Sequence, residues 1–214
     1  MSLPFSETAF LDLFGEYNTT FWPAVTLLWV VTAGLVFRWW RLGRLAGRWP
    51  WALLAVHWLW SGAYHWFFFR TINPAATFFA VLFVIQAIFF GWLAGTARAH
   101  LVIDRSARGV LGVALMSYSL VYPFLGLAFG LHYPRMPLFA VPCPTTLLTA
   151  GLLLLSTGTP RVTYVIPIVW AAIASSAALV LGIRADLMLI VAAGLLAIDV
   201  LFPQALGTRR TETT

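Results

Sequence analysis

The chain has 214 residues, of which 61% are hydrophobic and only 9% are charged. Soluble domains carry about 25% charged residues, so this chain has too few polar side chains to cover a surface in water. The composition excludes an ordinary soluble protein and predicts a polytopic membrane protein. The net charge of +6 comes from 13 arginines, with no lysine. Because these arginines stand in short segments between apolar runs, membrane orientation accounts for them better than nucleic-acid binding does.

Residues 4–17 are expected to form a short amphipathic helix on the outer membrane surface. Phe10, Leu13 and Phe14 share one helical face, and the acidic residues of this segment fall largely elsewhere. The alternative is a frayed polar terminus. The segment has neither a basic stretch nor a cleavage pattern, so no signal peptide is expected.

Seven apolar runs follow, most of them close to the roughly 20 residues that a membrane-crossing helix needs. This pattern predicts an all-α, polytopic transmembrane helical bundle within a single integral membrane domain, 1–214. Residues 20–203 would form the seven-helix bundle and residues 204–214 a polar cytoplasmic tail. The runs occupy residues 20–37, 50–69, 75–96, 109–130, 138–156, 162–182 and 187–203.

The arginines predict the orientation of the bundle. With the N-terminus outside and the C-terminus inside, ten arginines fall in inner segments and three in outer loops. If the fifth run entered and left on the same side, the count would become eight against five. The positive-inside rule therefore favours seven crossings. The inner arginines are Arg38, Arg41, Arg44, Arg48, Arg98, Arg105, Arg108, Arg161, Arg209 and Arg210, and the outer ones are Arg70, Arg135 and Arg184.

The most informative segment is residues 133–146, YPRMPLFAVPCPTT, with four prolines and the only cysteine of the chain, Cys143. Proline removes a backbone donor and clashes with the preceding turn, so the fifth helix is predicted to be interrupted. The helix would restart at Cys143–Pro144, with Pro144 at its first position. The 13 residues from Pro144 to Ser156 span about 20 Å, against a hydrocarbon core of about 30 Å. We therefore expect this helix to begin below the outer membrane boundary.

Polar residues expected at a similar depth form a candidate outward-facing vestibule around this helix start. A helix N-terminus carries partial positive charge and free N–H groups, which suit an anion, a carbonyl group or water. The alternative is a structural helix start buried against its neighbours. The candidate binding residues are His65, Asn73, Tyr122, His132, Cys143, Thr145 and Thr146.

The same residues include weak candidates for a metal site. Cys143 is a single thiol, and a soft metal would need further ligands such as His65 and His132. The alternative is an inert, apolar cysteine. The sequence requires no cofactor.

A second polar group lies deeper in the bundle. His57, Ser61, Tyr64 and His65 share one face of the second run, and Gln86 lies mid-way along the third. His57, Ser61, Tyr64 and Gln86 would form a polar relay, or else bind helices to one another.

Asp199 is the only acid inside a run. We expect it to extend towards Arg209 or Arg210 at the inner end. The alternative is a proton-carrying role.

Several membrane-protein classes are excluded by missing residues. A retinal protein needs a lysine, and the chain has none. The chain also lacks a phosphate loop, a Cys-x-x-Cys pair and the motifs of intramembrane proteases. No nucleophile stands beside a recognisable base, so an enzyme is less expected than a non-enzyme.

Several stretches together resemble a bacterial family of small multi-pass membrane proteins that is catalogued only as a domain of unknown function. The resemblance spans nearly the whole chain and supports the architecture, but it implies no activity. Members often have Gln after Trp-Pro-Ala, where this chain has Val25. The stretches are Tyr17-Asn18, Trp22-Pro23-Ala24, Tyr64-His65, Phe67-Phe68, Ile72-Asn73-Pro74-Ala75-Ala76, Tyr133-Pro134, the most specific one Pro142-Cys143-Pro144-Thr145-Thr146, and Gly151-Leu152-Leu153-Leu154.

The sequence thus favours a transporter or channel for a small solute or ion in the bacterial inner membrane. The alternative is a non-transporting accessory subunit of a membrane complex, or a membrane metal- or redox-binding module. The expected partners are the lipid bilayer and a small solute, with no nucleic acid. A homo-oligomer is compatible with the sequence, which does not determine the oligomeric state.

Overall fold

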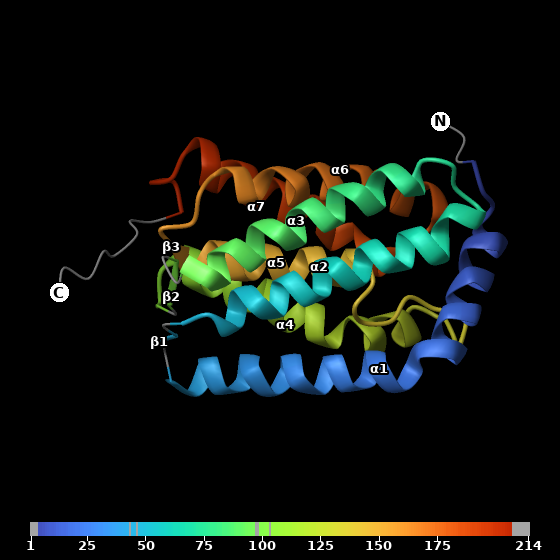
Figure 1. Cartoon of the computed structure of the whole chain (residues 1–214), viewed down its shortest axis with the longest axis horizontal. Coiled ribbons are helices and arrows are strands. Elements are labelled where there is room, and N and C mark those ends of the chain that lie inside the picture. The colour runs from blue at the N-terminus through green and yellow to red at the C-terminus, as the bar shows by residue number, and fades with distance from the viewer. Residues whose placement is uncertain (1–3, 43, 46, 97–98, 103, 207–214) are drawn as a thin grey trace.

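The computed structural model describes residues 4–42, 44–45, 47–96, 99–102 and 104–206. This part of the chain is an elongated helical bundle, as the composition predicts (Figure 1). The 3-10 turns η1 (Phe69–Thr71) and η2 (Arg184–Leu187) lie at one end of it. The seven α-helices found within the described residues are α1 (Glu7–Leu42), α2 (Trp49–Phe67), α3 (Ala76–Thr96), α4 (Ala107–Ala128), α5 (Pro142–Leu155), α6 (Val162–Leu181) and α7 (Met188–Leu201).

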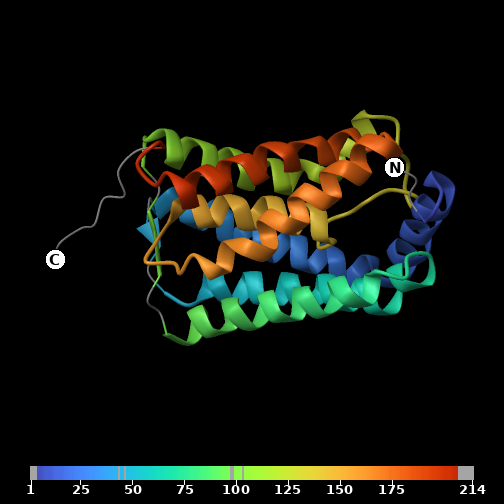
Figure 2. The ribbon, with the colours of Figure 1, turned by 90° about the horizontal axis from the view of Figure 1, so that it is seen from above.

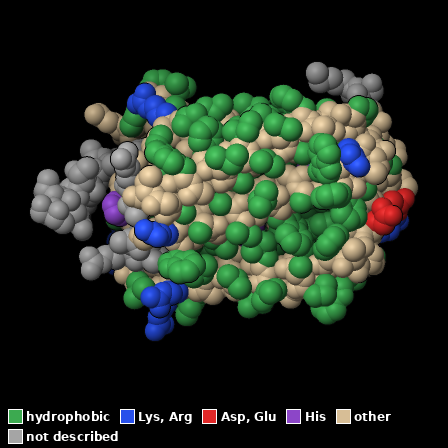
Figure 3. Space-filling model, in the orientation of Figure 1, with side chains coloured by type: hydrophobic (Ala, Val, Ile, Leu, Met, Phe, Trp, Pro, Cys, Tyr) green, Lys and Arg blue, Asp and Glu red, His purple; other side chains and the backbone are tan. Residues whose placement is uncertain are grey.

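Four of these helices, α1, α3, α4 and α6, are long and apolar enough to cross a membrane. Helices α5 and α7 have 14 residues each, and at 1.5 Å per residue each spans about 21 Å. That is shorter than the hydrocarbon core of about 30 Å. Figure 3 shows hydrophobic side chains over much of the side of the bundle, with charged side chains gathered towards its two ends. Length and composition therefore make four helices compatible with membrane insertion.

Helix α1 joins two segments that the sequence pattern separates. We predicted a surface helix at 4–17 and a first crossing at 20–37, but the structure has one 36-residue helix. Figure 1 shows this helix bending, so that its first turns lie across the end of the bundle and the rest runs along its side. Pro23 lies inside the helix, where its missing N–H and its ring favour a bend.

A small antiparallel sheet that the sequence analysis did not predict lies at the opposite end of the all-helical bundle. It consists of β1 (Arg44–Leu45), β2 (His100–Val102) and β3 (Ser156–Thr157), in the order β1-β2-β3. The indole N–H of Trp51 donates to the carbonyl oxygen of Ala99, beside this sheet, at 3.0 Å. Strands of two or three residues are too short to show an alternating pattern, so the sequence does not reveal them.

Helix α5 lies at the centre of the bundle (Figure 2), where it contacts α2, α4, α6 and α7. Every residue of this helix is buried except Cys143, which is half-buried. The helix begins at Pro142, so Pro142 takes the first helical position that we expected for Pro144. Residues 131–141, directly ahead of it, are not helical.

Two glycines allow α4 and α5 to approach closely. A Cβ atom added to Gly112 would lie 2.9 Å from the carbonyl oxygen of Gly151. A Cβ atom added to Gly151 would lie 2.6 Å from the carbonyl oxygen of Gly112. Small residues that bring helix backbones together are a common means of association in membranes.

We expect Gly151→Ala to lower the free energy of unfolding by about 1–3 kcal/mol, because the added methyl group overpacks this contact. Gly194→Ala is the matched control on α7, where a Cβ atom meets no other atom within 4 Å. The control substitution should not lower the free energy of unfolding, because alanine is a better helix former than glycine. Thermal unfolding in detergent compares the two variants, and equal stabilities would contradict the close contact.

A buried ion pair joins α4 and α7 near the sheet. The guanidinium of Arg108 donates to the carboxylate of Asp199 at 2.6 Å, and the two side chains are 6% and 0% exposed. Arg108 also donates to the carbonyl oxygen of Leu153 on α5 at 3.3 Å, and the hydroxyl of Tyr164 on α6 donates to Asp199 at 3.2 Å. This cluster therefore connects four helices.

The prediction that Arg108 lies in an inner loop is wrong. Helix α4 begins at Ala107, so Arg108 lies in its first turn and faces the bundle. We expected Asp199 to extend towards Arg209 or Arg210, and these two residues lie outside the described part of the chain. Within the described part of the chain, Asp199 pairs with Arg108.

Replacement of Asp199 by Asn should lower the free energy of unfolding by about 3–5 kcal/mol, because it leaves the buried Arg108 without its counter-charge. The double variant Arg108→Met/Asp199→Leu should regain most of that loss. Denaturation curves of the three proteins in detergent test this. The pair has no structural role if Asp199→Asn is as stable as the natural protein.

Candidate functional site

A cavity of about 130 Å³ lies at the start of α5, at the end of the bundle away from the sheet. Helices α1, α2, α3, α5 and α6 and the turns η1 and η2 all contribute to its walls. Ile173 and Ser176 of α6 line it and are also exposed on the side of the bundle. The cavity therefore reaches the protein surface beside α6.

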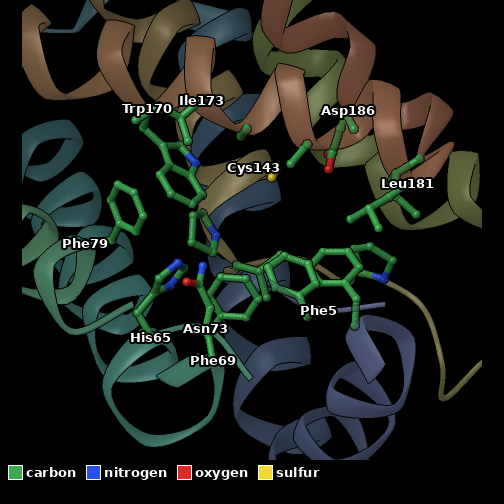
Figure 4. A pocket seen from close by; sticks show the side chains of 18 of the residues that line it. Phe5, His65, Phe69, Asn73, Phe79, Cys143, Trp170, Ile173, Leu181 and Asp186 are labelled. Carbon is green, nitrogen blue, oxygen red and sulfur yellow. The ribbon is translucent and has the colours of Figure 1, made fainter. Parts of the chain in front are cut away.

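The walls are mostly apolar and include several aromatic rings (Figure 4). Phe10 contacts Phe5 and Phe69, with ring centroids 5.7 and 6.0 Å apart. On another wall, Trp170 packs against Phe79, with ring centroids 5.2 Å apart. The first set of contacts holds the first turns of α1 against η1, and the second joins α3 to α6.

The segment that leads into α5 is fixed by hydrogen bonds from two helices. The side-chain amide of Asn18 donates to the carbonyl oxygens of Pro134 and Met136 at 2.6 and 2.7 Å. The hydroxyl of Ser61 on α2 donates to the carbonyl oxygen of Ala140 at 3.3 Å. Buried carbonyl groups of a non-helical segment need such partners, because lipid offers none.

His65 supplies a buried polar group on one wall of the cavity. Its side chain is 1% exposed, and its Nδ1 atom lies 3.3 Å from the carbonyl oxygen of Ser61. Its Nε2 atom has no hydrogen-bond partner in the described part of the chain. Figure 4 shows His65 and Asn73 on one side of the cavity and Asp186 on the other. The imidazole can therefore offer a hydrogen bond to a bound molecule.

Asp186 of η2 is a buried acid on the opposite wall. It is 4% exposed, and its carboxylate accepts a hydrogen bond from the hydroxyl of Tyr122. Burial raises the pKa of Asp186 from 3.8 to about 6, while hydrogen bonds from Tyr122 and Cys143 act to lower the pKa. A perturbed acid in a cavity is a candidate functional group.

Sequence reasoning missed Asp186. The available signal was the shortness of the loop between the sixth and seventh runs, residues 183–186, which keeps its side chains at the end of the bundle. An acid in so short an apolar connection has few ways to reach water.

The predicted vestibule residues are only partly brought together. His65, Asn73 and Cys143 line the cavity, and Tyr122 reaches it through Asp186. His132 is exposed, and its backbone pairs with that of Arg135 in an isolated β-bridge within the proline-rich segment.

Two threonines of the predicted vestibule lie below the cavity, inside the bundle. Thr145 is fully buried, 3.4 Å from the hydroxyl of Ser61. Thr146 donates to the carbonyl oxygen of Pro142 in its own helix at 2.8 Å.

For a metal, the described residues contain no group of three or more His, Cys, Asp or Glu side chains that could hold an ion. His65 and Cys143 both line the cavity, but His132 does not.

A family model matches residues 7–212 of the chain, and its description is a family of unknown function, DUF6064. The chain belongs to the DUF6064 family. The match covers nearly the whole chain, as the resemblance read from the sequence does. Comparison with the curated proteins and with the solved structures finds no match.

In this DUF6064 protein three of the four candidate relay residues bind helices to one another. His57 Nε2 lies 3.0 Å from the hydroxyl of Thr32 on α1, and the amide of Gln86 donates to the carbonyl oxygen of Thr163 on α6 at 2.9 Å. Ser61 reaches the start of α5, and the Tyr64 hydroxyl has no partner among the described residues. No hydrogen bond found in the described structure joins one of these four side chains to another.

The buried carboxylate predicts a pH-dependent stability. Because the pKa of Asp186 is raised in the folded state, the native protein holds this proton more tightly than the unfolded chain between about pH 4 and 6. Asp186→Asn should therefore be more stable than the natural protein at pH 8, by on the order of 1–3 kcal/mol. The difference should shrink as the pH falls from 6 to 4. Unfolding at a series of pH values measures this, and a constant difference would contradict it.

Proposed function

We propose that this DUF6064 protein crosses the bacterial inner membrane seven times and is a transporter or channel for a small solute. The N-terminus would lie outside and the C-terminus inside, with the fifth crossing interrupted ahead of Pro142. The observation that carries the proposal is the cavity at the start of the short, buried helix α5. Interrupted helices at membrane depth often form the binding sites of transporters.

The charges at the two ends of the bundle support this orientation. Arg70, Arg135 and Arg184 belong to the cavity end, together with the acidic first turns of α1. Most of the other described arginines belong to the sheet end, which suits the positive side of an inner membrane. Arg98, Arg209 and Arg210, which we also expect inside, lie outside the described residues.

The lengths of the helices support an outward-facing position for the cavity. Helix α5 spans about 21 Å, so the non-helical residues 131–141 must occupy the remaining depth of a bilayer of about 30 Å. Non-helical backbone at that depth is tolerated where protein or a watered cavity surrounds it. The cavity at the start of α5 meets that condition.

Binding without transport is the second candidate, as an accessory subunit or a metal- or redox-binding module. One observation favours it: below the cavity, Thr145, Thr146 and Thr149 are fully buried within α5. A transporter would have to open this packing during its cycle, whereas a binding protein would not.

The single cysteine of the chain tests the proposal. A small, membrane-impermeant methanethiosulfonate should label Cys143 from outside in intact cells. It should also label Cys143, in a second conformation, from the cytoplasmic face of inside-out vesicles. Labelling from the outside alone would favour binding without transport. Labelling from the inside alone would contradict the proposal that the cavity faces outward.

Two controls accompany the labelling. Ala178→Trp fills the cavity and should protect Cys143, whereas Ala172→Trp places the same ring on the exposed face of α6 and should not. In a Cys143→Ser background, Tyr133→Cys should be labelled in intact cells and Arg161→Cys only after permeabilisation. The opposite result for the last pair would reverse the orientation.

A further inference from the structure

We propose that the cavity binds a small organic cation with an apolar body, whose ammonium group lies against the carboxylate of Asp186. This inference rests on the proposed function, because it names the class of solute for the same cavity. Three features of the cavity support it: an acid without a cationic partner, aromatic walls and a polar group on the opposite side.

Asp186 lacks a cationic partner in the described part of the chain. The ion pairs found there are Arg108–Asp199 and Arg135–Asp12, and neither involves Asp186. Its neighbours Tyr122 and Cys143 are neutral hydrogen-bond donors. A buried carboxylate is stabilised most by a positive charge, and the ammonium group of a ligand supplies one.

The aromatic walls suit the rest of such a ligand. Phe5, Phe10, Phe69 and Trp170 line the space near Asp186 and His65 (Figure 4). Aromatic ring faces attract cations, and more strongly where water is excluded. The same rings bury an apolar body. A small inorganic cation would leave most of this surface without contact.

The acid also decides against an anion at the start of α5, which the sequence had suggested. A helix N-terminus carries about +0.5 elementary charge, and this favours ionised Asp186. A second anion at the same place would be repelled by the carboxylate. On the opposite wall, the Nε2 atom of His65 has no partner and can bind a hydroxyl or a second polar group of the ligand.

Binding of three matched compounds to the full-length protein in nanodiscs tests the inference. They are 2-phenylethylamine (a cation), 2-phenylethanol (neutral) and 3-phenylpropionate (an anion). At pH 7.5 the amine should bind about tenfold or more tightly than the alcohol, and the anion most weakly. Asp186→Asn should lower the affinity for the amine to that for the alcohol. The exposed Asp12 supplies the control, because Asp12→Asn also removes one negative charge and should leave the amine bound.

The affinity for the amine should also fall as the pH drops below about 6, because protonation removes the charge of Asp186. The other titratable groups that act on Asp186 are Tyr118 and Tyr122 of α4 and Cys143 of α5, which stay neutral at acidic pH. Arg184 on the same turn is exposed. A response that came from His65 would persist in Asp186→Asn and would contradict the assignment.

The titratable groups on the remaining helices packed against η2 are distant. On α6 and α7 these are Tyr164 and Asp199, which lie with Arg108 at the sheet end. They are therefore not expected to contribute to the pH response.

The outcomes separate this inference from the proposed function. If the alcohol binds as tightly as the amine, or if Asp186→Asn keeps the preference for the amine, the cation assignment is wrong and the cavity still binds a solute. Asp186 would then only accept hydrogen bonds from Tyr122 and from Cys143 at the start of α5. If none of the three compounds binds or slows the labelling of Cys143, the cation inference fails, and labelling of Cys143 from the two membrane faces still decides the proposed function.

Discussion

The burial of a helix that is too short to span a bilayer determines the rest of this structure. Helix α5 has 14 residues and is enclosed by four other helices, so its ends lie inside the protein. The contact between Gly112 and Gly151 holds it against α4. Because the helix begins at Pro142, residues 131–141 ahead of it form no helix. Asn18 and Ser61 donate hydrogen bonds to carbonyl groups of this segment, and the cavity lies where it meets the helix.

Most polar side chains inside the bundle join one helix to another. The pair Arg108–Asp199 and the hydrogen bond from Gln86 to α6 are examples, and such contacts are common in membrane bundles. Several buried polar atoms have no partner among the described residues, and those of His57 and Gln86 lie away from the cavity. One nitrogen of His65 has no partner among the described residues, and Asp186 has only neutral neighbours. Both line the same cavity, so a ligand there can hydrogen-bond to His65 and supply a positive charge beside Asp186.

The sequence predicted the helical membrane architecture and the importance of the proline-rich segment, because composition and proline chemistry act locally. Three of the seven proposed vestibule residues, His65, Asn73 and Cys143, line one cavity, since their depth follows from their position along each run. Sequence reasoning missed Asp186 and the partner of Asp199, because both depend on which helices pack together. Thr145 and Thr146 do not line the cavity, because the direction of a side chain around a helix start depends on where the helix begins. The strands were too short to leave a pattern.

An experimental structure in lipid nanodiscs with 2-(4-bromophenyl)ethylamine tests the central claim most directly. The bromine identifies the ligand by its scattering. We expect the ligand in the cavity at the start of α5, with its amine beside Asp186 and its ring against the aromatic wall that includes Trp170. A cavity filled by Phe5 and Phe10, with the bromine elsewhere or absent, would contradict the account.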